Sequence, residues 1–177
     1  YSRYANDVTK IKTNLAKTIQ QSQLKENHKK NLNERLYDSR ANCKIKTSQI
    51  TRYLSTEWRN GLFIQLDSLM DEENWEEIDS PITDESFTSF LRFITYEKPD
   101  RRPGLGSTSS GNILAMWTLG SNRLTIEFLA KDRARCVFSH VVNFFRESGA
   151  YDNIEITEIS KFIATLFEYK RLFSNDN

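Results

Sequence analysis

Few side chains in this sequence have the types and spacing that catalysis or metal binding needs. The chain has two histidines, His28 and His140, and neither belongs to a cysteine–histidine pattern typical of zinc sites. His140 follows a predicted strand at Cys136–Phe138, where a catalytic dyad is conceivable, but no nucleophile motif accompanies it. The pattern therefore predicts an ordinary histidine at a strand end.

Two further segments resemble ligand-binding motifs only in part. The acids of Asp71–Glu77 offer oxygen ligands for a divalent cation, but they lack the spacing and the glycine of a calcium loop. The small residues of Gly104–Gly111 lack the lysine of a phosphate-binding loop and precede a predicted strand instead of a helix. We therefore expect no cofactor, no metal and no catalytic residue, and an enzyme is the third choice among the functions considered.

Charge is segregated along the chain, although the net charge is only +1. Residues 1–60 hold thirteen basic and five acidic side chains, whereas residues 67–86 hold nine acids and no base. Such asymmetry is typical of a surface that binds nucleic acid or an acidic partner. It equally fits two blocks of one molecule that neutralise each other.

Residues 1–60 contain neither glycine nor proline and are rich in Lys, Gln, Asn and Leu, which favours helices. An apolar stripe runs from Val8 to Ile19, and a second stripe starts at Leu32. The polar stretch Gln20–Asn31 predicts a connection between them, and Thr47-Ser48 predicts a second break with an N-cap. We expect one α+β domain over residues 61–177, preceded by a basic helical region over residues 1–60 that is a candidate interaction arm.

The second region contains an acidic loop (67–86), a helix, three strands and a C-terminal helix. Thr83 is the expected N-cap of the central helix, which buries Phe87, Phe90, Leu91 and Ile94. Strict alternation in Asn112–Thr118, Asn122–Leu129 and Arg133–Ser139 predicts a three-stranded antiparallel meander over residues 112–139, with Leu124, Ile126 and Phe128 in the core. A last helix is expected from about Glu158 to Phe173, capped by Thr157 and burying Ile159, Phe162, Ile163, Leu166 and Phe167. The predicted fold class is α+β.

Several short motifs follow one another in a recognisable order. They are Asn74-Trp75 with the acids after it, Pro81-Ile82-Thr83, Pro103-x-Leu105-Gly106-x-Thr108, Gly111-Asn112-Ile113 with Trp117, and Leu124-x-Ile126-Glu127-Phe128. Together they resemble a widespread, largely uncharacterised bacterial family of small α+β proteins, over about residues 62–140. The resemblance implies bacterial origin and a role in a mobile, toxin–antitoxin-like or defence-associated gene cassette. It implies no catalytic residue.

The expected function is a non-catalytic protein-interaction component of such a cassette. The partner is a protein or a second copy of the chain, docked through the N-terminal helices; the alternative is nucleic-acid binding by the same basic helices. The candidate partner-binding residues are Lys25, Lys29, Lys30, Arg35, Glu72, Glu73, Trp75 and Glu76. No apolar run is long enough to span a membrane. Cys43 and Cys136 are expected to be reduced packing residues of a cytoplasmic protein.

Overall fold

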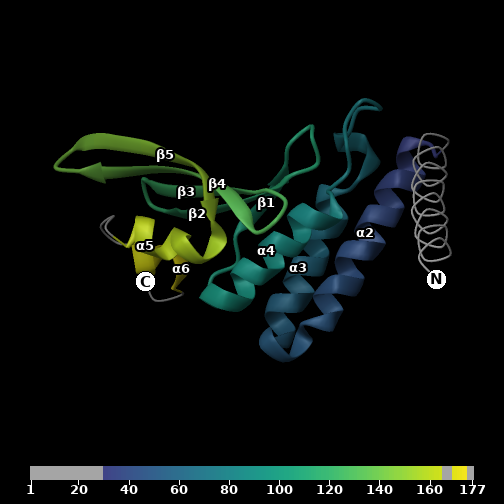
Figure 1. The fold of residues 1–177 in the computed structure, drawn as a ribbon, viewed down its shortest axis with the longest axis horizontal. Coiled ribbons are helices and arrows are strands. Elements are labelled where there is room, and N and C mark those ends of the chain that lie inside the picture. Colours follow the sequence, from purple (N-terminus) through teal and green to yellow (C-terminus); the bar gives the residue numbers. More distant parts are fainter. Residues whose placement is uncertain (1–29, 165–168, 175–177) are drawn as a thin grey trace, which may run out of the picture.

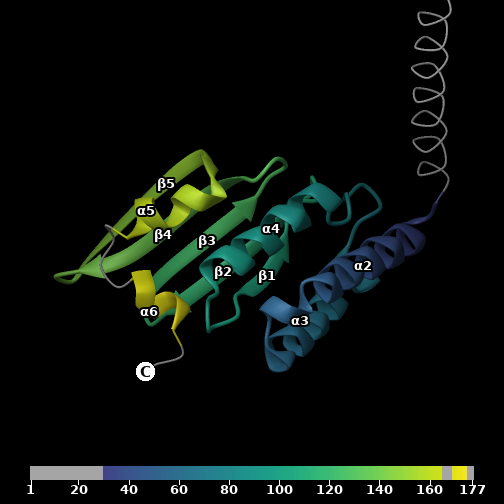
Figure 2. The ribbon, with the colours of Figure 1, turned by 60° about the horizontal axis from the view of Figure 1, so that its bottom comes forward.

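The computed structural model describes residues 30–164 and 169–174 (Figure 1). Its helices are α2 (Leu32–Gln49), α3 (Thr56–Leu69), α4 (Asp84–Glu97), α5 (Ile159–Ile163) and α6 (Tyr169–Phe173). Helices α4, α5 and α6 lie on one side of an antiparallel sheet, and α2 and α3 pack beside α4 (Figures 1 and 2). This arrangement confirms the predicted α+β class.

The sheet is a five-stranded antiparallel meander in which each strand pairs with the next along the chain. Its strands are β1 (Gly104–Ser107), β2 (Ile113–Leu119), β3 (Asn122–Phe128), β4 (Arg133–Val142) and β5 (Phe145–Glu155). The three predicted strands correspond to β2, β3 and β4, and the prediction missed the two edge strands, β1 and β5. Gly-Leu-Gly-Ser in β1 has no alternation, and most side chains of β5 are exposed, so neither carries the apolar pattern of a half-buried strand.

The core lies between α4 and the middle of the sheet. Leu124, Ile126 and Phe128 are fully buried, which confirms the predicted phase of this strand. The Phe128 ring lies 5.5 Å from Phe90 and 5.4 Å from Phe93, measured between ring centroids. Tilted and edge-to-face aromatic contacts of this kind add to the gain from burying the rings.

Helix α4 begins as predicted, because the Thr83 side chain accepts a hydrogen bond from the Ser86 N–H. The buried Ser86 hydroxyl then ties the helix to two strands. It donates to the Phe128 carbonyl oxygen at 2.6 Å and accepts from the Ile113 N–H at 2.8 Å. These two bonds fix the rotation of α4 above the sheet. At its other end, the helix stops at Lys98, whose φ of 50° is left-handed.

Helices α2 and α3 share this core. Leu36 and Cys43 of α2 and Leu62 and Leu66 of α3 belong to the same buried cluster as the sheet residues. The expected boundary between residues 60 and 61 falls inside α3, so the described part of the basic region is packed into the fold. The acidic segment (residues 67–86) is also not one loop, because it includes the end of α3 and the start of α4.

The predicted break at Thr47-Ser48 is misplaced. Both hydroxyls donate back to main-chain carbonyl oxygens one turn earlier in α2, which runs to Gln49. The turn that separates the helices follows it, and the Ser55 side chain caps α3 by accepting from the Trp58 N–H. The stripe from Val8 to Ile19 and most of the predicted connection lie outside the described residues.

The C-terminal helix also differs from the prediction. A 3₁₀ turn over Ile156–Glu158 precedes α5, so Thr157 is not its cap. Ile159 is buried as expected, whereas Phe162 is 39% exposed and contacts the Tyr151 ring of β5. Leu166 and Phe167 lie outside the described residues. Of the helices that the structure describes, none has the length and apolar character to cross a membrane.

Candidate functional site

Arg35 joins α2 to the end of the acidic segment. Its guanidinium donates to the main-chain carbonyl oxygens of Glu77 at 2.9 Å and Asp79 at 3.3 Å, and it lies 3.3 Å from the Glu77 carboxylate. One turn further along α2, the Ser39 hydroxyl donates to the Ile82 carbonyl oxygen at 2.7 Å. These bonds hold the segment before α4 against the side of α2.

Three further polar side chains of α2 continue this pattern on both of its flanks. Asn42 and Lys46 reach the Asp84 carboxylate at 2.6 and 2.9 Å, on the side of α4. Lys44 bonds both oxygens of the Asp67 carboxylate at 2.6 and 2.7 Å, on the side of α3. Three acids of residues 67–86, namely Asp67, Glu77 and Asp84, are therefore paired with basic side chains of α2, so the two blocks neutralise each other in part within one molecule.

The predicted partner-binding residues are only partly brought together. Lys25 and Lys29 lie outside the described residues. Lys30 pairs with Asp38 at 2.7 Å. Lys30 and Glu72 both line an open hollow of about 680 Å³ beside the first half of α2. Two of the predicted residues thus share one surface, and Arg35 is engaged with the main chain of the acidic segment.

Trp75 has a structural position. Its indole N–H donates to the Leu69 carbonyl oxygen at 2.7 Å, and its half-buried ring packs against the core. The side chains of Glu73 and Glu76 are exposed on either side of it. The fold therefore covers part of the Trp75 ring, and partner binding by Glu72, Glu73, Trp75 and Glu76 stays a prediction.

Side chains that could bind a metal ion are not clustered in the described residues. No group of three or more His, Cys, Asp or Glu side chains in residues 30–164 and 169–174 is placed to hold a metal ion. His140 lies at the outer end of β4, where its Nε2 is 3.4 Å from the Glu147 carboxylate and its ring stacks on Phe138. The contact with Glu147 joins β4 to β5, and the contact with Phe138 lies within β4.

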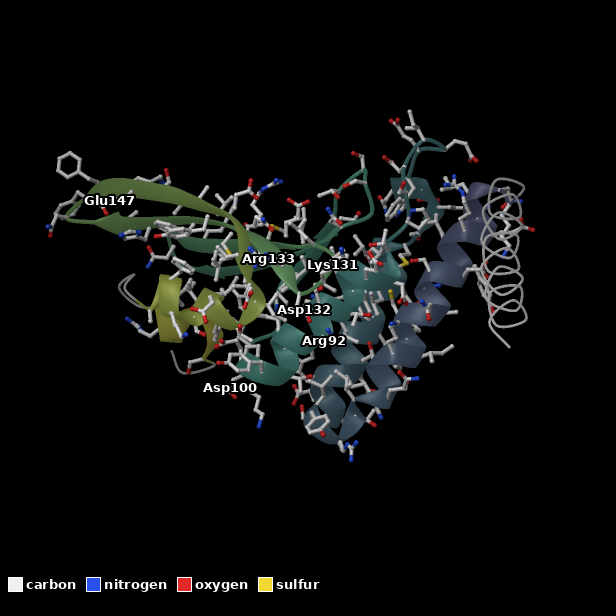
Figure 3. The ribbon with its side chains drawn as sticks, in the orientation of Figure 1. Arg92, Asp100, Lys131, Asp132, Arg133 and Glu147 are labelled. Carbon is white, nitrogen blue, oxygen red and sulfur yellow. The ribbon has the colours of Figure 1, made fainter. Side chains whose placement is uncertain are left out.

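The most unusual surface is the end of the hairpin formed by β4 and β5, which we call the hairpin tip (residues 141–146). The two strands extend beyond the helices, with Glu147 labelled near their outer end (Figure 3). Phe144 is 101% exposed and Phe145 is 76% exposed. Asn143 and Phe144 form the two-residue turn, with φ of 49° and 70°. The hairpin tip therefore presents two large apolar rings to solvent.

Aromatic contacts support the hairpin behind its tip. Phe138 stacks on His140 and on Tyr151, with ring centroids 5.8 and 5.9 Å apart, and Tyr151 packs on Phe162 of α5 at 5.1 Å. The Phe138 ring lies so close to Gly149 that a Cβ atom there would be 2.5 Å from it. Gly149 is therefore required for the ring to cover β5. These contacts hold β4 and β5 together where the hairpin extends beyond the helices.

Sequence reasoning missed this site. The available signal was Val141-Val142-Asn143-Phe144-Phe145, an apolar run that is interrupted only by Asn143. Asparagine is a preferred first residue of a two-residue hairpin turn, but the expected glycine after it is replaced by Phe144. The absence of that glycine hid the turn and at the same time placed the ring at its end.

No protein-family model, curated protein or solved structure matches this chain. The candidate site therefore depends on the geometry of the chain itself, and the family resemblance of residues 62–140 stays a prediction.

Proposed function

We propose that this chain is a non-catalytic protein-interaction component of a bacterial defence or toxin–antitoxin-like cassette, acting in the cytoplasm, and that the hairpin tip is its docking element. The role in a cassette depends on the resemblance of residues 62–140. The docking role depends on one observation, the exposure of Phe144 and Phe145 on a supported turn.

The energetics favour a partner for this tip. Burial of one phenylalanine side chain contributes about 1.5–3 kcal/mol, and two adjacent rings form a compact anchor of the kind that dominates protein interfaces. A left-handed backbone conformation costs a residue with a side chain about 1–2 kcal/mol, which glycine would avoid. Phe144 adopts that conformation while its ring contacts no core residue. The ring thus opposes folding stability and supports a role outside the fold.

The chemistry of the tip defines the partner surface. Arg146 and Glu147 follow the two rings on β5, and Arg146 is bonded to the Ser139 hydroxyl at 3.0 Å. The matching surface is an apolar pocket large enough for two rings, with a polar rim that accepts one positive and one negative charge. The predicted contact through Lys25 and Lys29 stays a prediction.

The test is co-purification of the full chain with the protein encoded by the adjacent gene. We expect stable binding by the unchanged chain, and a dissociation constant raised at least about tenfold by the Phe144→Ser/Phe145→Ser double variant. Ile64→Ser is the matched control, because Ile64 is 69% exposed on α3, away from the hairpin. Equal binding by the double variant would contradict the assignment of the tip.

The same preparation separates the alternative function. A nucleic-acid-binding protein would lose affinity steeply as salt rises, because each neutralised phosphate releases counterions. We expect only weak binding to duplex DNA or RNA at physiological salt. Tight binding there, abolished when Lys25, Lys29, Lys30 and Arg35 are changed to Glu, would favour nucleic acid as the partner.

A further inference from the structure

Strand β5 is an edge strand with little protection. It is 11 residues long, pairs only with β4 among the described strands, and contains neither proline nor lysine; its charged residues, Arg146, Glu147, Asp152 and Glu155, lie toward its two ends and leave its centre uncharged. The unpaired N–H and C=O groups of such an edge are a template for another strand, and proteins usually block them with charges, proline or bulges. The main-chain groups along this edge are therefore available to pair with a strand of another chain.

One hydrogen bond shows which main-chain groups face the open edge. The Val141 N–H donates to the Asn122 side chain at 3.1 Å, so it points away from β5. Its register partner Arg146 is thus in a pair that exchanges no hydrogen bonds, and in antiparallel ladders such pairs alternate. The main-chain groups of Arg146, Ser148 and Ala150 therefore point away from β4, toward the open edge.

A bulge blocks only the far end of this edge. The register shifts by one residue between Ala134 and Cys136, and Asn153 has a φ of 52°. A bulge increases the local twist and ends regular pairing. Residues 146–151 precede the bulge and form the regular part of the open edge, and Asp152 follows the last regular pair, Cys136 with Tyr151.

We propose that a second copy of this chain pairs with residues 146–152 in an antiparallel arrangement, which joins two sheets into one. A two-fold axis at Gly149 places Arg146 opposite Asp152 of the partner subunit, and Ser148 opposite Ala150 of the partner subunit. Both charges are on the face of the sheet opposite the helices, because Arg146 bonds Ser139 and Asp152 bonds Arg135. The register therefore matches each positive charge with a negative one.

Side-chain size agrees with this register. The centre of the pairing contains Ser148, Gly149 and Ala150, so small residues meet near the axis. The Asp152 carboxylate bonds Arg135 through Oδ1 only and is largely exposed, which leaves its other oxygen for a second cation. The pairing uses the main chain of the open edge and the side chains of Arg146 and Asp152, but neither ring of the hairpin tip, so it does not depend on the docking role of those rings.

The experiment measures the mass of the full chain by sedimentation across concentration. We expect a dimer whose dissociation constant rises at least about tenfold in Arg146→Glu, because two attractive pairs become repulsive. The double variant Arg146→Glu/Asp152→Arg should restore the dimer, since it exchanges the charges. Arg123→Glu is the control, because Arg123 is exposed on β3 and belongs to no open edge.

A second variant tests the main chain itself. Ser148→Pro removes one N–H from the open edge and leaves the bonds to β4 in place, so it should weaken the dimer while the circular dichroism spectrum stays unchanged. A chain that is monomeric up to about 0.5 mM would overturn the proposal. A dimer that tolerates both Arg146→Glu and Ser148→Pro would overturn it as well.

Discussion

Arg35 holds Glu77 by main chain and side chain together: its guanidinium donates to the Glu77 carbonyl oxygen at 2.9 Å and lies 3.3 Å from the Glu77 carboxylate. The two residues are 42 positions apart in sequence. A guanidinium can reach two acceptors at once because its donors form a rigid planar fork. This contact explains why two blocks of opposite charge in the sequence form one structural unit.

Removal of this guanidinium should loosen the acidic segment. Arg35→Ala is expected to lower the free energy of unfolding by about 1–2 kcal/mol, because the partly buried carbonyl oxygen of Asp79 and the exposed one of Glu77 lose a charged donor. Arg35→Lys should recover only part of the loss, since an ammonium group cannot span both carbonyls. Hydrogen exchange should become faster over residues 71–80.

The control for this prediction is another arginine on a neighbouring helix. Arg92 of α4 pairs with Asp132, but both side chains are more than one third exposed. Arg92→Ala should therefore cost less than about 1 kcal/mol. If the two variants lose the same free energy of unfolding, the bonds of Arg35 to the main chain stabilise the fold no more than an exposed ion pair does.

The centre of the core gives a larger prediction. Phe128 is fully buried between two rings of α4, so Phe128→Ala should lower the free energy of unfolding by about 3–5 kcal/mol through the cavity it leaves. Phe145→Ala, at a ring that is mostly exposed, should change it by no more than about 0.5 kcal/mol. Denaturant titrations of both variants measure the contrast.

The contrast between these rings also shows what the sequence could predict. Phe128 lies on a strand that is covered on one face only, so alternation revealed both the strand and its buried side. Phe145 begins a strand that extends past the helices, and burial there does not select apolar side chains at every second position. The edge strands were therefore missed although the class and the three central strands were found.

Helix ends followed the same logic. Thr83 was recognised because its side chain caps a helix that starts where its apolar face starts. Thr47 and Ser48 carry the same chemical groups but bond backward to the preceding turn, and the local sequence does not distinguish the two uses. The pairing of Arg35 with the acidic segment depends on tertiary packing, so charge counts left it as one of two alternatives.

The two cysteines provide a pH-dependent prediction. Both are free, and burial raises the pKa of the Cys43 thiol and the Cys136 thiol from 9.0 to about 12. The folded chain then keeps its thiol protons where the unfolded chain loses them. The stability that the neutral thiols contribute is complete below about pH 9 and is lost as the pH rises from 9 toward 12.

Comparison with a variant isolates this effect from the titration of tyrosine and lysine. The free energy of unfolding should fall less between pH 9 and 11 in Cys43→Ala/Cys136→Ala than in the unchanged chain. At pH 8, a thiol reagent should label the folded chain at least about a thousandfold more slowly than the urea-unfolded chain. Fast labelling of the folded chain would show that one thiol is accessible.

The last prediction concerns Phe144, where stability and docking should separate. Glycine adopts the left-handed conformation without the steric cost that a side chain has, and it is the preferred second residue of this turn. Phe144→Gly should therefore raise the free energy of unfolding by about 0.5–1 kcal/mol, after subtraction of the larger entropy of glycine in the unfolded chain. Gly120→Ala is the reverse control, because Gly120 has a φ of 57° in the turn between β2 and β3, so this variant should be less stable than the unchanged chain.

If the Phe144 ring contacts a partner, the stabilised Phe144→Gly variant should bind the adjacent gene product at least about tenfold more weakly. A variant that is more stable and binds equally well would show that Phe144 has no role in docking, whereas lower stability would show that its ring supports the hairpin.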